Sequence, residues 1–405
     1  MVRARSAVII GAGAVGMATA YALARRGLSV TIIDENPQPA MGASHANGAQ
    51  LSYCYTDALA SPAILKNMPG LLLRRDPAFR LHCRPDWRYL AWLARFLSNC
   101  TPRRFEKHTL AGLRLARESF RAMDDLTAAH DIDFGLRTNG KMHLLDDQQS
   151  LERARYTVNL KNGQCGKQEI LSPGEAIAIE PALEDRRADI AGAVYSPGEQ
   201  VGDAFRFCQQ MAGILAASYH VQTCFGQRVA RVDPGQADTR IELASGDILT
   251  ADLAIICAAS SSGSLLTPLG ITLPVEPMKG YSFEMPMGNG SPTTSITDTR
   301  RRLVFTNLGD RMRVAGLADL GDRQAVLREN RMETLIKLAR QSLPDAGRFD
   351  QASSFWAGLR PMTPDSLPII SRPMPGLAIN TGHGMLGWTL AMGSGERLAK
   401  LVGAD

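Results

Sequence analysis

The chain has few of the features that mark a disulfide-bonded or metal-binding protein. Its seven cysteines are an odd number, and no two of them form a Cys-x-x-Cys pair. This pattern disfavours a disulfide framework or a zinc site and suits a reducing compartment. The seven histidines are widely separated, with no His-x-x-x-His pair, so the sequence predicts no metal site.

The sequence also lacks a long apolar run. No stretch of 18 or more uninterrupted apolar residues occurs, which argues against a membrane-spanning helix. The apolar residues 7–24, preceded by Arg3 and Arg5, could be mistaken for a signal peptide. They contain regularly spaced glycines and are followed at once by a second apolar segment, so we interpret them as folded protein.

No block of basic residues is present. Lys and Arg number 45 against 40 Asp and Glu, and the excess of +5 is spread along the chain, so nucleic acid is not an expected partner. The 405 residues, 45% hydrophobic and 21% charged, have the composition of a soluble globular protein with about two or three structural units.

The first chemical signal is a glycine-rich turn after a short apolar strand. Residues 7–10 form a β-rich run, and a helical segment begins after Gly16. Gly11 permits a tight turn, Gly13 lets a pyrophosphate approach the backbone, and Gly16 lets the helix pack against the strand. The amino terminus of the helix offers free N–H groups to phosphates.

Asp34 ends the next predicted strand, about 20 residues after the glycines. An acidic residue there is positioned to accept hydrogen bonds from ribose hydroxyls. A lone glycine motif is weak evidence, but strand, glycines, helix, second strand and terminal acid occur here together. The sequence therefore predicts an adenine dinucleotide, against the alternative of a purely structural glycine turn.

The later part of the chain favours FAD over NAD. After residues 42–50 the chain continues irregularly to Pro85, without the regular strand and helix alternation of an NAD dehydrogenase. The dinucleotide-binding unit resumes near the middle of the chain, with a helix at 203–217, further strands, a hairpin and the apolar strand 253–259. The predicted fold class is α/β. A split Rossmann-like FAD-binding domain comprises residues 1–85, 195–265 and 350–405, and an inserted substrate domain of mixed β-sheet and helices comprises 86–194 and 266–349.

Four segments resemble the D-amino-acid dehydrogenase group, within the family of FAD-dependent D-amino-acid, glycine and sarcosine oxidases. They are residues 47–52, 277–282, 356–365 and 380–389, and the resemblance runs over nearly the whole chain. It implies noncovalent FAD and oxidation of an amino acid to an imino acid, with electrons passing to a quinone or another respiratory carrier. The residues expected to bind the cofactor are Gly11, Gly13, Val15, Gly16, Asp34, Glu35, Ser44, His45, Asn47, Gly48, Gln50, Leu51, Val229, Ala258, Ala259, Gly358, Gly382, Gly384, Met385, Leu386, Gly387, Trp388 and Thr389.

His45 departs from the pattern of the related dehydrogenases. A histidine near the flavin raises the alternative of a covalent histidyl link, as in more distant amine dehydrogenases. A packing or hydrogen-bonding histidine is the other interpretation.

Arg360 follows apolar strand material and is the main candidate for substrate binding. A guanidinium matches a carboxylate in a bidentate geometry and stays charged in a dry pocket. An ion pair with Asp365 is the structural alternative, whereas the resemblance implies that Arg360 clamps the substrate α-carboxylate. His383, just before the helix predicted at 386–401, is either a flavin-facing donor or a structural loop residue.

Two tyrosines are further candidates for the active site. Tyr281 is expected in a sheet strand, as a pocket wall and hydrogen-bond donor or as a packed residue without function. Tyr55, just after the segment near the flavin, is a weaker candidate of the same kind. No side-chain base is predicted, because the flavin performs the redox chemistry and the protein orients the substrate.

Residues 64–97 combine apolar and aromatic side chains with interleaved arginines. This pattern is typical of a helix at a membrane interface, which would bring the protein to a lipid-dissolved quinone at the inner face of the cytoplasmic membrane. A helix packed into the core has the same pattern. The sequence leaves both possibilities open, with Trp87, Trp92 and Phe96 as the residues that decide between them.

The sequence thus predicts FAD-dependent oxidative deamination of small D-amino acids. An oxygen-dependent oxidase of glycine, sarcosine or a hydroxyproline-type secondary amine is the nearest enzymatic alternative. A subunit that holds FAD mainly for assembly or electron relay is an alternative of another class.

Overall fold

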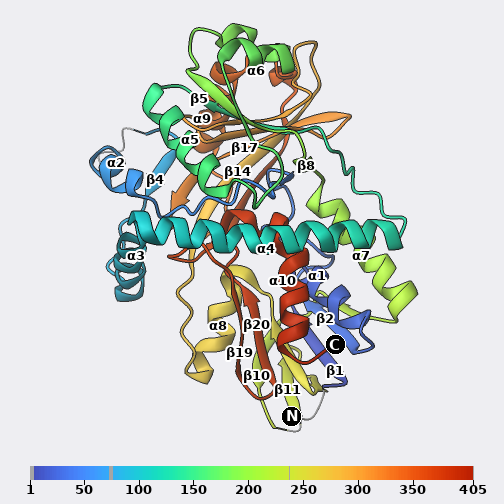
Figure 1. Cartoon of the computed structure of the whole chain (residues 1–405). Coiled ribbons are helices and arrows are strands. Elements are labelled where there is room, and N and C mark those ends of the chain that lie inside the picture. The colour runs from blue at the N-terminus through green and yellow to red at the C-terminus, as the bar shows by residue number, and fades with distance from the viewer. Residues whose placement is uncertain (1–3, 73–75, 237, 405) are drawn as a thin grey trace.

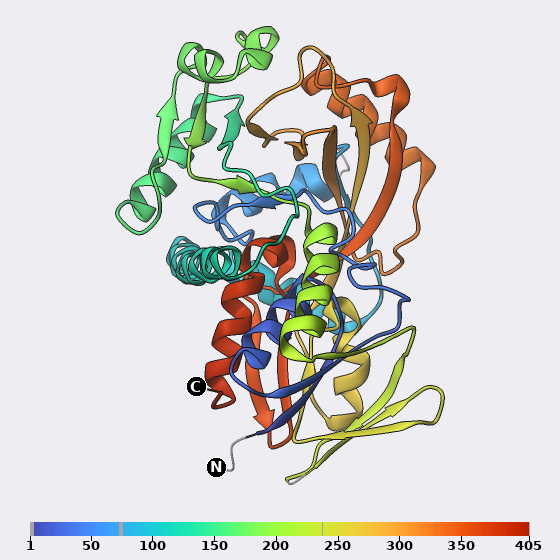
Figure 2. The same cartoon turned by 90° about the vertical axis from the view of Figure 1, so that its right-hand side faces the viewer.

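The computed structural model describes residues 4–72, 76–236 and 238–404. The chain forms two bodies, each built on a β-sheet, with the long helix α4 (Pro102–Ala129) between them (Figure 1). The view turned by 90° shows the same two bodies, and both termini belong to the lower one (Figure 2). The predicted α/β fold class is confirmed.

The lower body contains a six-stranded sheet that is parallel except at one edge, where β19 runs antiparallel to β20. Its central strands are apolar and buried on both faces, as parallel strands require. A three-stranded antiparallel sheet covers one side. The strand order of the large sheet is β19 (Ile369–Met374), β20 (Leu377–Thr381), β13 (Leu253–Ile256), β1 (Ser6–Ile10), β2 (Ser29–Asp34) and β9 (Gln222–Phe225), and the small sheet contains β10 (Val229–Asp233), β11 (Thr239–Leu243) and β12 (Ile248–Ala251).

Helix α1 (Ala14–Ala24) is the centre of this body. Ten of its eleven residues are buried, because α7 (Ala204–Tyr219), α10 (Gly387–Leu401) and the sheet surround it. A Cβ on Gly395 of α10 would lie 2.7 Å from the carbonyl oxygen of Ala18, and one on Gly393 would lie 2.6 Å from the amide nitrogen of Ser119 in α4. Glycine at these two positions therefore lets α10 pack closely between α1 and α4.

The upper body is a nine-stranded mixed sheet. Helix α9 (Glu329–Ser342) packs on one of its faces, through a core that includes Phe283, Phe305 and Leu335. The strands follow the order β18 (Ser353–Met362), β14 (Glu276–Pro286), β17 (Arg311–Leu320), β16 (Leu303–Asn307), β15 (Ser295–Asp298), β5 (Lys141–Leu145), β7 (Gly192–Ser196) and β6 (Glu169–Leu171), with β4 (Phe79–Leu81) paired to β17.

The remaining elements connect or cover the two bodies. Strands β3 (Gln50–Leu51) and β8 (Gln200–Val201) pair with each other. The other helices are α2 (Pro62–Leu72), α3 (Trp87–Asn99), α5 (Gln148–Lys161), α6 (Pro173–Ile179) and α8 (Ser262–Leu266). No helix in the described ranges is both long and apolar enough to cross a membrane.

The predicted domain boundaries place each of three segments in one body, whereas the structure places it in the other. Strands β4 and β18, assigned to residues 1–85 and 350–405 of the cofactor domain, pair with β17 and β14 of the upper sheet. Helix α4, assigned to the substrate domain, packs Leu115, Ala116 and Met123 into the core of the lower body. We propose to keep the division into two units with these three segments reassigned.

Candidate active site

The glycine turn after β1 has the geometry that its sequence predicts. Gly11 has a φ of +110°, and a Cβ on it would lie 2.7 Å from the carbonyl oxygen of Cys257 at the end of β13. A Cβ on Gly16 would lie only 1.8 Å from the carbonyl oxygen of Gly11. Any larger residue at either position would push the turn away from the strand ends, so the chain needs glycine at both.

Side chains from two neighbouring loops orient the groups around this turn. The amide of Ala14, at the start of α1, donates to Ser44 Oγ at 3.1 Å. The amide of Ala12 donates to Asp34 Oδ2 at 2.7 Å, and Asn36 donates to Asp34 Oδ1 through its amide and its side chain. The carboxylate is thereby held at the tip of β2, beside the turn.

A cavity of about 1160 Å³ runs from this turn to the upper sheet. Its size suits a dinucleotide together with a small substrate, because drug-sized ligands occupy about 300 to 1,000 Å³. Most of the residues predicted to bind FAD border it. They are Gly11, Gly13, Val15, Asp34, Glu35, Ser44, Asn47, Gly48, Gln50, Val229, Ala258, Ala259, Gly358, Gly384, Met385, Leu386, Gly387, Trp388 and Thr389.

Four residues predicted to bind the cofactor do not border the cavity. Gly16 lies behind the turn, and Leu51 is fully buried in the core around α1. Gly382 has a φ of +78° and packs against Thr363. His45 lies edge-on against Phe205 of α7, with 4.9 Å between ring centroids, so the histidine that raised the possibility of a covalent link is directed at a helix instead.

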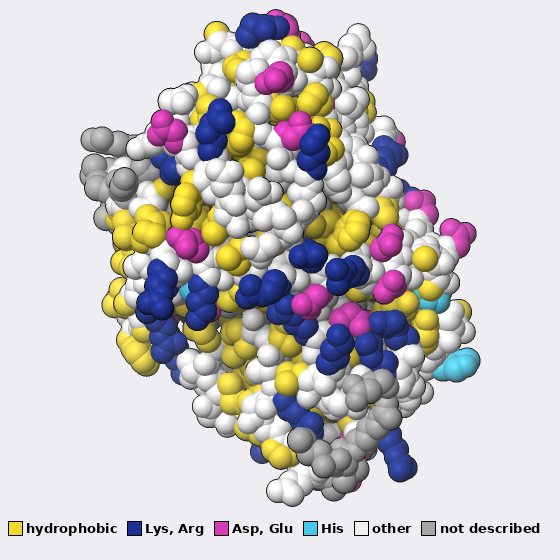
Figure 3. Space-filling model, in the orientation of Figure 1, with side chains coloured by type: hydrophobic (Ala, Val, Ile, Leu, Met, Phe, Trp, Pro, Cys, Tyr) yellow, Lys and Arg dark blue, Asp and Glu magenta, His cyan; other side chains and the backbone are white. Residues whose placement is uncertain are grey.

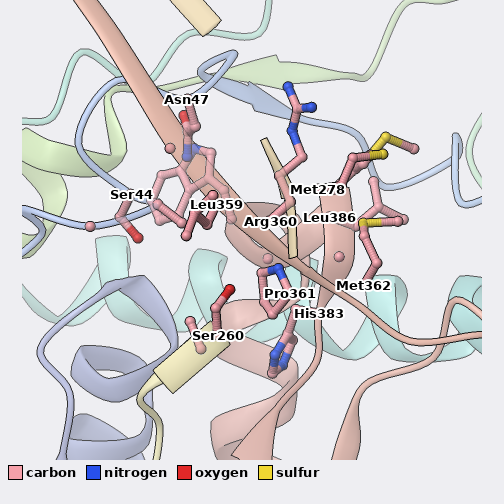
Figure 4. Close-up of a pocket in the computed structure, with 18 of the residues that line it drawn as sticks. Ser44, Asn47, Ser260, Met278, Leu359, Arg360, Pro361, Met362, His383 and Leu386 are labelled. Atoms are coloured by element: carbon pink, nitrogen blue, oxygen red, sulfur yellow. The ribbon is translucent and has the colours of Figure 1, made fainter. Parts of the chain in front are cut away.

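Arg360 lies at the upper end of the cavity, on β18 (Figure 4). Its guanidinium occupies the space that a side chain on Gly280 would need, and Nη1 donates to the carbonyl oxygen of Leu317 at 3.1 Å. Among the residues of known placement, no carboxylate lies within 4 Å of it, and Asp365 instead accepts from the amide of Leu367. Burial lowers the pKa of Arg360 from 12.5 to about 10, which leaves a charged group without a counter-ion at neutral pH.

Apolar side chains surround Arg360. Met278, Met362 and Leu386 lie beside it, and Pro361 follows it (Figure 4). His383 is 4% exposed and its Nε2 has no hydrogen-bond partner; burial lowers its pKa to about 3. His383 is therefore neutral at physiological pH and borders the cavity.

Tyr281 touches the cavity, but its hydroxyl is already bonded. It donates to Asp319 Oδ2 at 3.0 Å, and Asp319 also pairs with Arg331 at 2.6 Å. The ring packs in the core under α9. The hydroxyl of Tyr281 is therefore engaged within the protein, which favours the alternative of a packed sheet tyrosine over a hydrogen-bond donor to the substrate.

Tyr55 does border the cavity, together with two basic residues that the sequence analysis missed. Its ring stacks on His143 with 3.7 Å between centroids, and the Lys141 ammonium lies 4.8 Å from the same ring. Lys141 and His143 alternate with Met142 in β5, so both face away from the apolar core on that strand's other side. Period-2 alternation within an otherwise apolar strand was the only signal for them.

Residues 64–97 divide between core and surface. Trp92 and Phe96 are buried, and Trp92 Nε1 donates to the carbonyl oxygen of Met362 at 3.0 Å, so these two residues cannot form a membrane surface. The exposed apolar residues are Trp87 at 75% and, less so, Leu65, Leu90 and Leu97. Leu73, Arg74 and Arg75 lie outside the described residues, as do the side chains of Leu71 and Leu72.

One group in the described chain has metal-ligand geometry: His82, Asp319 and Asp322. Asp319 pairs with Arg331, and Asp322 pairs with Lys279 and Arg328. The two carboxylates are thus already compensated by cationic side chains.

The geometry of turn, cavity and arginine agrees with comparisons with known proteins. A family model described as "FAD dependent oxidoreductase" (DAO) matches residues 6–401. The chain belongs to this family. Its cofactor is FAD, and the glycine turn, the oriented Asp34 and the cavity provide a fitting site.

Relatives within this oxidoreductase family are similar over nearly their whole length. The chain is 38% identical over 405 residues to D-amino acid dehydrogenase 2 of Ralstonia nicotianae, covering 97% of this chain and 95% of that protein. It is 38% identical over 404 residues to D-amino acid dehydrogenase 2 of Pseudomonas aeruginosa, with coverages of 99% and 95%. The predicted resemblance is therefore confirmed.

Solved structures share the fold at lower identity. L-proline dehydrogenase from P. horikoshii superposes with a TM-score of 0.76 at 17% identity, covering 100% of this chain and 94% of that one. Glycine oxidase from Geobacillus kaustophilus gives a TM-score of 0.74 at 21% identity, with coverages of 99% and 95%. Both share the fold of this chain over nearly their whole length.

Proposed function

We propose that this oxidoreductase oxidises D-amino acids to imino acids, which water hydrolyses to 2-oxo acids and ammonia. The observation that carries the proposal is Arg360, a buried guanidinium without a counter-ion at the end of a cavity that fits FAD. Such a group binds a carboxylate through charge-assisted hydrogen bonds. The relatives named D-amino acid dehydrogenase support the D configuration.

When bound, FAD supplies the acceptor for the hydride that leaves Cα of the amino acid. The chain's own contribution is to hold and desolvate the substrate. Arg360 fixes the α-carboxylate, and Met278, Met362 and Leu386 exclude water from its surroundings. Because burial lowers the pKa of His383 to about 3, its neutral imidazole does not accept a further proton at neutral pH, and we expect the substrate amine to bind unprotonated. The rate of flavin reduction should therefore rise with pH.

Product analysis tests the reaction. The purified holoenzyme, given an artificial dye as acceptor and a D-amino acid, should form one 2-oxo acid and one ammonia per two electrons transferred. The matching L-amino acid should give neither. Dye reduction without ammonia release would contradict the proposal, and so would an inactive chain that requires a partner subunit.

We further propose that a membrane quinone accepts the electrons. The cavity wall beside Arg360 continues along Trp92, Phe96 and Leu97 to α2 and α3, so an apolar surface connects the site with the outside of these helices. Figure 3 shows apolar and basic side chains gathered at the edge of the molecule where Figure 1 places α3. The exposed apolar residues there are Trp87, Leu90 and Leu97, and the exposed basic ones are Arg88, Arg95, Arg103, Arg104 and Lys107.

This combination suits the surface of an anionic bilayer, because apolar side chains enter the headgroup region while arginines and lysines bind the lipid phosphates. The protein would thereby lie at the inner face of the cytoplasmic membrane. Wild-type protein should float with anionic liposomes, and the double variant Trp87→Gln/Leu90→Gln should not. Ile248→Gln, which changes an apolar residue on β12 that is nearly as exposed as Leu90, is the control and should float. Equal flotation of all three, or oxygen consumption as fast as quinone reduction, would contradict the quinone proposal.

A further inference from the structure

We propose that Cys54 and Cys165 are a modification site, at which a hydroperoxide oxidises first Cys165 and then the pair to a reversible disulfide. This site is independent of the amino acid oxidation proposed above. It lies beside the cavity, because Cys54 directly precedes Tyr55, whose ring borders the cavity. All seven cysteines are free thiols in the structure, so the bond would form and break in the folded protein.

The two thiols are neighbours although they lie far apart in the chain. Cys54 follows β3, and Cys165 lies in the turn between α5 and β6; their side chains share a hydrogen bond. A Cβ on Gly166 would lie 3.5 Å from Cys54 Sγ, so this sulfur packs directly against the turn. Lys161 touches both partners, because its carbonyl oxygen lies 3.8 Å from Cys165 Sγ and its ammonium donates to the carbonyl oxygen of Cys54 at 2.8 Å.

The turn is the part that can move when the sulfurs approach to the disulfide bond length of about 2 Å. The backbone of Cys54 is held on both sides, because its amide donates to Glu199 Oε1 at 2.5 Å and its carbonyl oxygen accepts from Lys161. In the turn, Gly163 is exposed, and a Cβ on it would meet no described atom within 4 Å. We therefore expect Cys165 to move toward Cys54.

The acidity of the two thiols gives them different roles. The hydrogen bond from Cys54 and the ammonium of Lys161 lower the pKa of Cys165 to about 7, against burial and the carboxylates of Glu199 and Asp57. The same hydrogen bond, together with burial, raises the pKa of Cys54. Cys54 is only 7% exposed, whereas Cys165 is half-buried. An accessible thiolate beside a second thiol is typical of cysteines that react with peroxides, so Cys165 should react first.

The oxidation consumes one molecule of hydrogen peroxide. The Cys165 thiolate attacks one peroxide oxygen, so that an S–O bond forms, the O–O bond breaks, and the released hydroxide takes up a proton as water. The Cys54 sulfur then attacks Cys165 Sγ of the sulfenic acid. An S–S bond forms, the S–O bond breaks, and the hydroxide leaves as a second water with the proton that Cys54 gives up. The two electrons lost by the sulfurs have reduced the peroxide.

Peptide mapping of the holoenzyme tests the pairing. Protein reduced with dithiothreitol is treated with a small excess of hydrogen peroxide, alkylated, and digested without reductant. Mass spectrometry should find a new peptide pair joined through Cys54 and Cys165, and a second treatment with dithiothreitol should remove it. Oxidation of Cys165 to a sulfinic acid while Cys54 stays alkylated would overturn the proposal. A disulfide of either residue with another cysteine would overturn it too.

Two substitutions test the order of the steps. In Cys54→Ser no second thiol follows, so the sulfenic acid of Cys165 should persist and be labelled by dimedone. In Cys165→Ser the buried Cys54 should remain reduced and unlabelled. The opposite labelling, or none in Cys54→Ser, would overturn the assignment of Cys165 as the first site of attack. If a variant loses its FAD, the map of the wild-type protein still decides the pairing.

Cys83→Ser is the matched control, because it removes an exposed cysteine outside the pair. This variant should form the bond between Cys54 and Cys165 as fast as the wild type does. Loss of the bond in Cys83→Ser would overturn the proposal, because the disulfide would then arise by exchange through Cys83 and not by direct oxidation of Cys165.

Discussion

Replacing Arg360 with methionine should strongly weaken substrate binding without harming the fold. Methionine keeps part of the length of the arginine side chain and its apolar contacts, but it removes the guanidinium. The protein loses little by this, because the guanidinium donates only one hydrogen bond within the described chain, to the carbonyl oxygen of Leu317. We therefore expect Arg360→Met to bind FAD as the wild type does and to lose flavin reduction by amino acids.

Arg360→Met should leave the stability of the folded protein unchanged or raise it, but should lower its affinity for the substrate. Burial lowers the pKa of Arg360 from 12.5 in the unfolded chain to about 10 in the folded protein. At every pH below 10, holding the charged guanidinium in the folded protein therefore costs stability. The difference corresponds to roughly 3 kcal/mol, and water in the cavity screens part of this cost. The melting temperature of the variant should equal or exceed that of the wild type. Loss of a charge-assisted carboxylate contact should cost about 2 to 5 kcal/mol, or roughly 30- to 4,000-fold in substrate affinity.

Arg331→Met is the matched control for a buried arginine that does have a partner. Arg331 pairs with Asp319 at 2.6 Å and both side chains are 1% exposed, so its loss should cost about 3 to 5 kcal/mol of stability. Melting temperatures and stopped-flow flavin reduction measure both effects. If Arg360→Met melts as low as Arg331→Met, or if it keeps an unchanged dependence on amino acid concentration, the role assigned to Arg360 is wrong.

Other substitutions test the remaining features of the site. Gly16→Ala should lose FAD, seen as a lower flavin absorbance per protein, because its Cβ would lie 1.8 Å from a carbonyl oxygen. Trp92→Ala should cost about 3 to 5 kcal/mol of stability because the indole is buried, whereas Trp87→Gln should melt like the wild type; the reverse order would contradict the division of α3 into core and surface. Tyr281→Phe should lose about 1 kcal/mol of stability from its bond to Asp319 and retain flavin reduction. An inactive variant with normal substrate binding would instead show that the Tyr281 hydroxyl acts as an acid or base.

The sequence predicts the cofactor end of the site well because its signals are local. Gly11, Gly13 and Gly16 lie within six residues. The strand before them and the helix after them can be told apart because their apolar residues follow different spacings. Their geometry follows from steric limits that act within one turn of chain. Arg360 was expected to follow apolar strand material, and it lies within β18, two residues before the end of that strand.

Contacts between segments far apart in the chain could not be predicted from the sequence. Strand β4 has only three residues and pairs with β17, more than 230 positions away, and α4 carries an apolar stripe that fits either body. The orientation of His45 depends on Phe205 in a distant helix. Lys141 and His143 have no motif of their own, and only the folded sheet brings them into the same cavity as Arg360.

Mixing purified holoenzyme with single enantiomers of amino acids under anaerobic conditions shows whether the protein, with FAD bound in its cavity, oxidises D-amino acids. The flavin absorbance reports reduction independently of the natural electron acceptor. We expect D-amino acids to bleach the flavin in a single turnover, with a rate that saturates with substrate, and their L-enantiomers to leave it oxidised. Equal bleaching by both enantiomers, or none by any D-amino acid, would contradict this expectation.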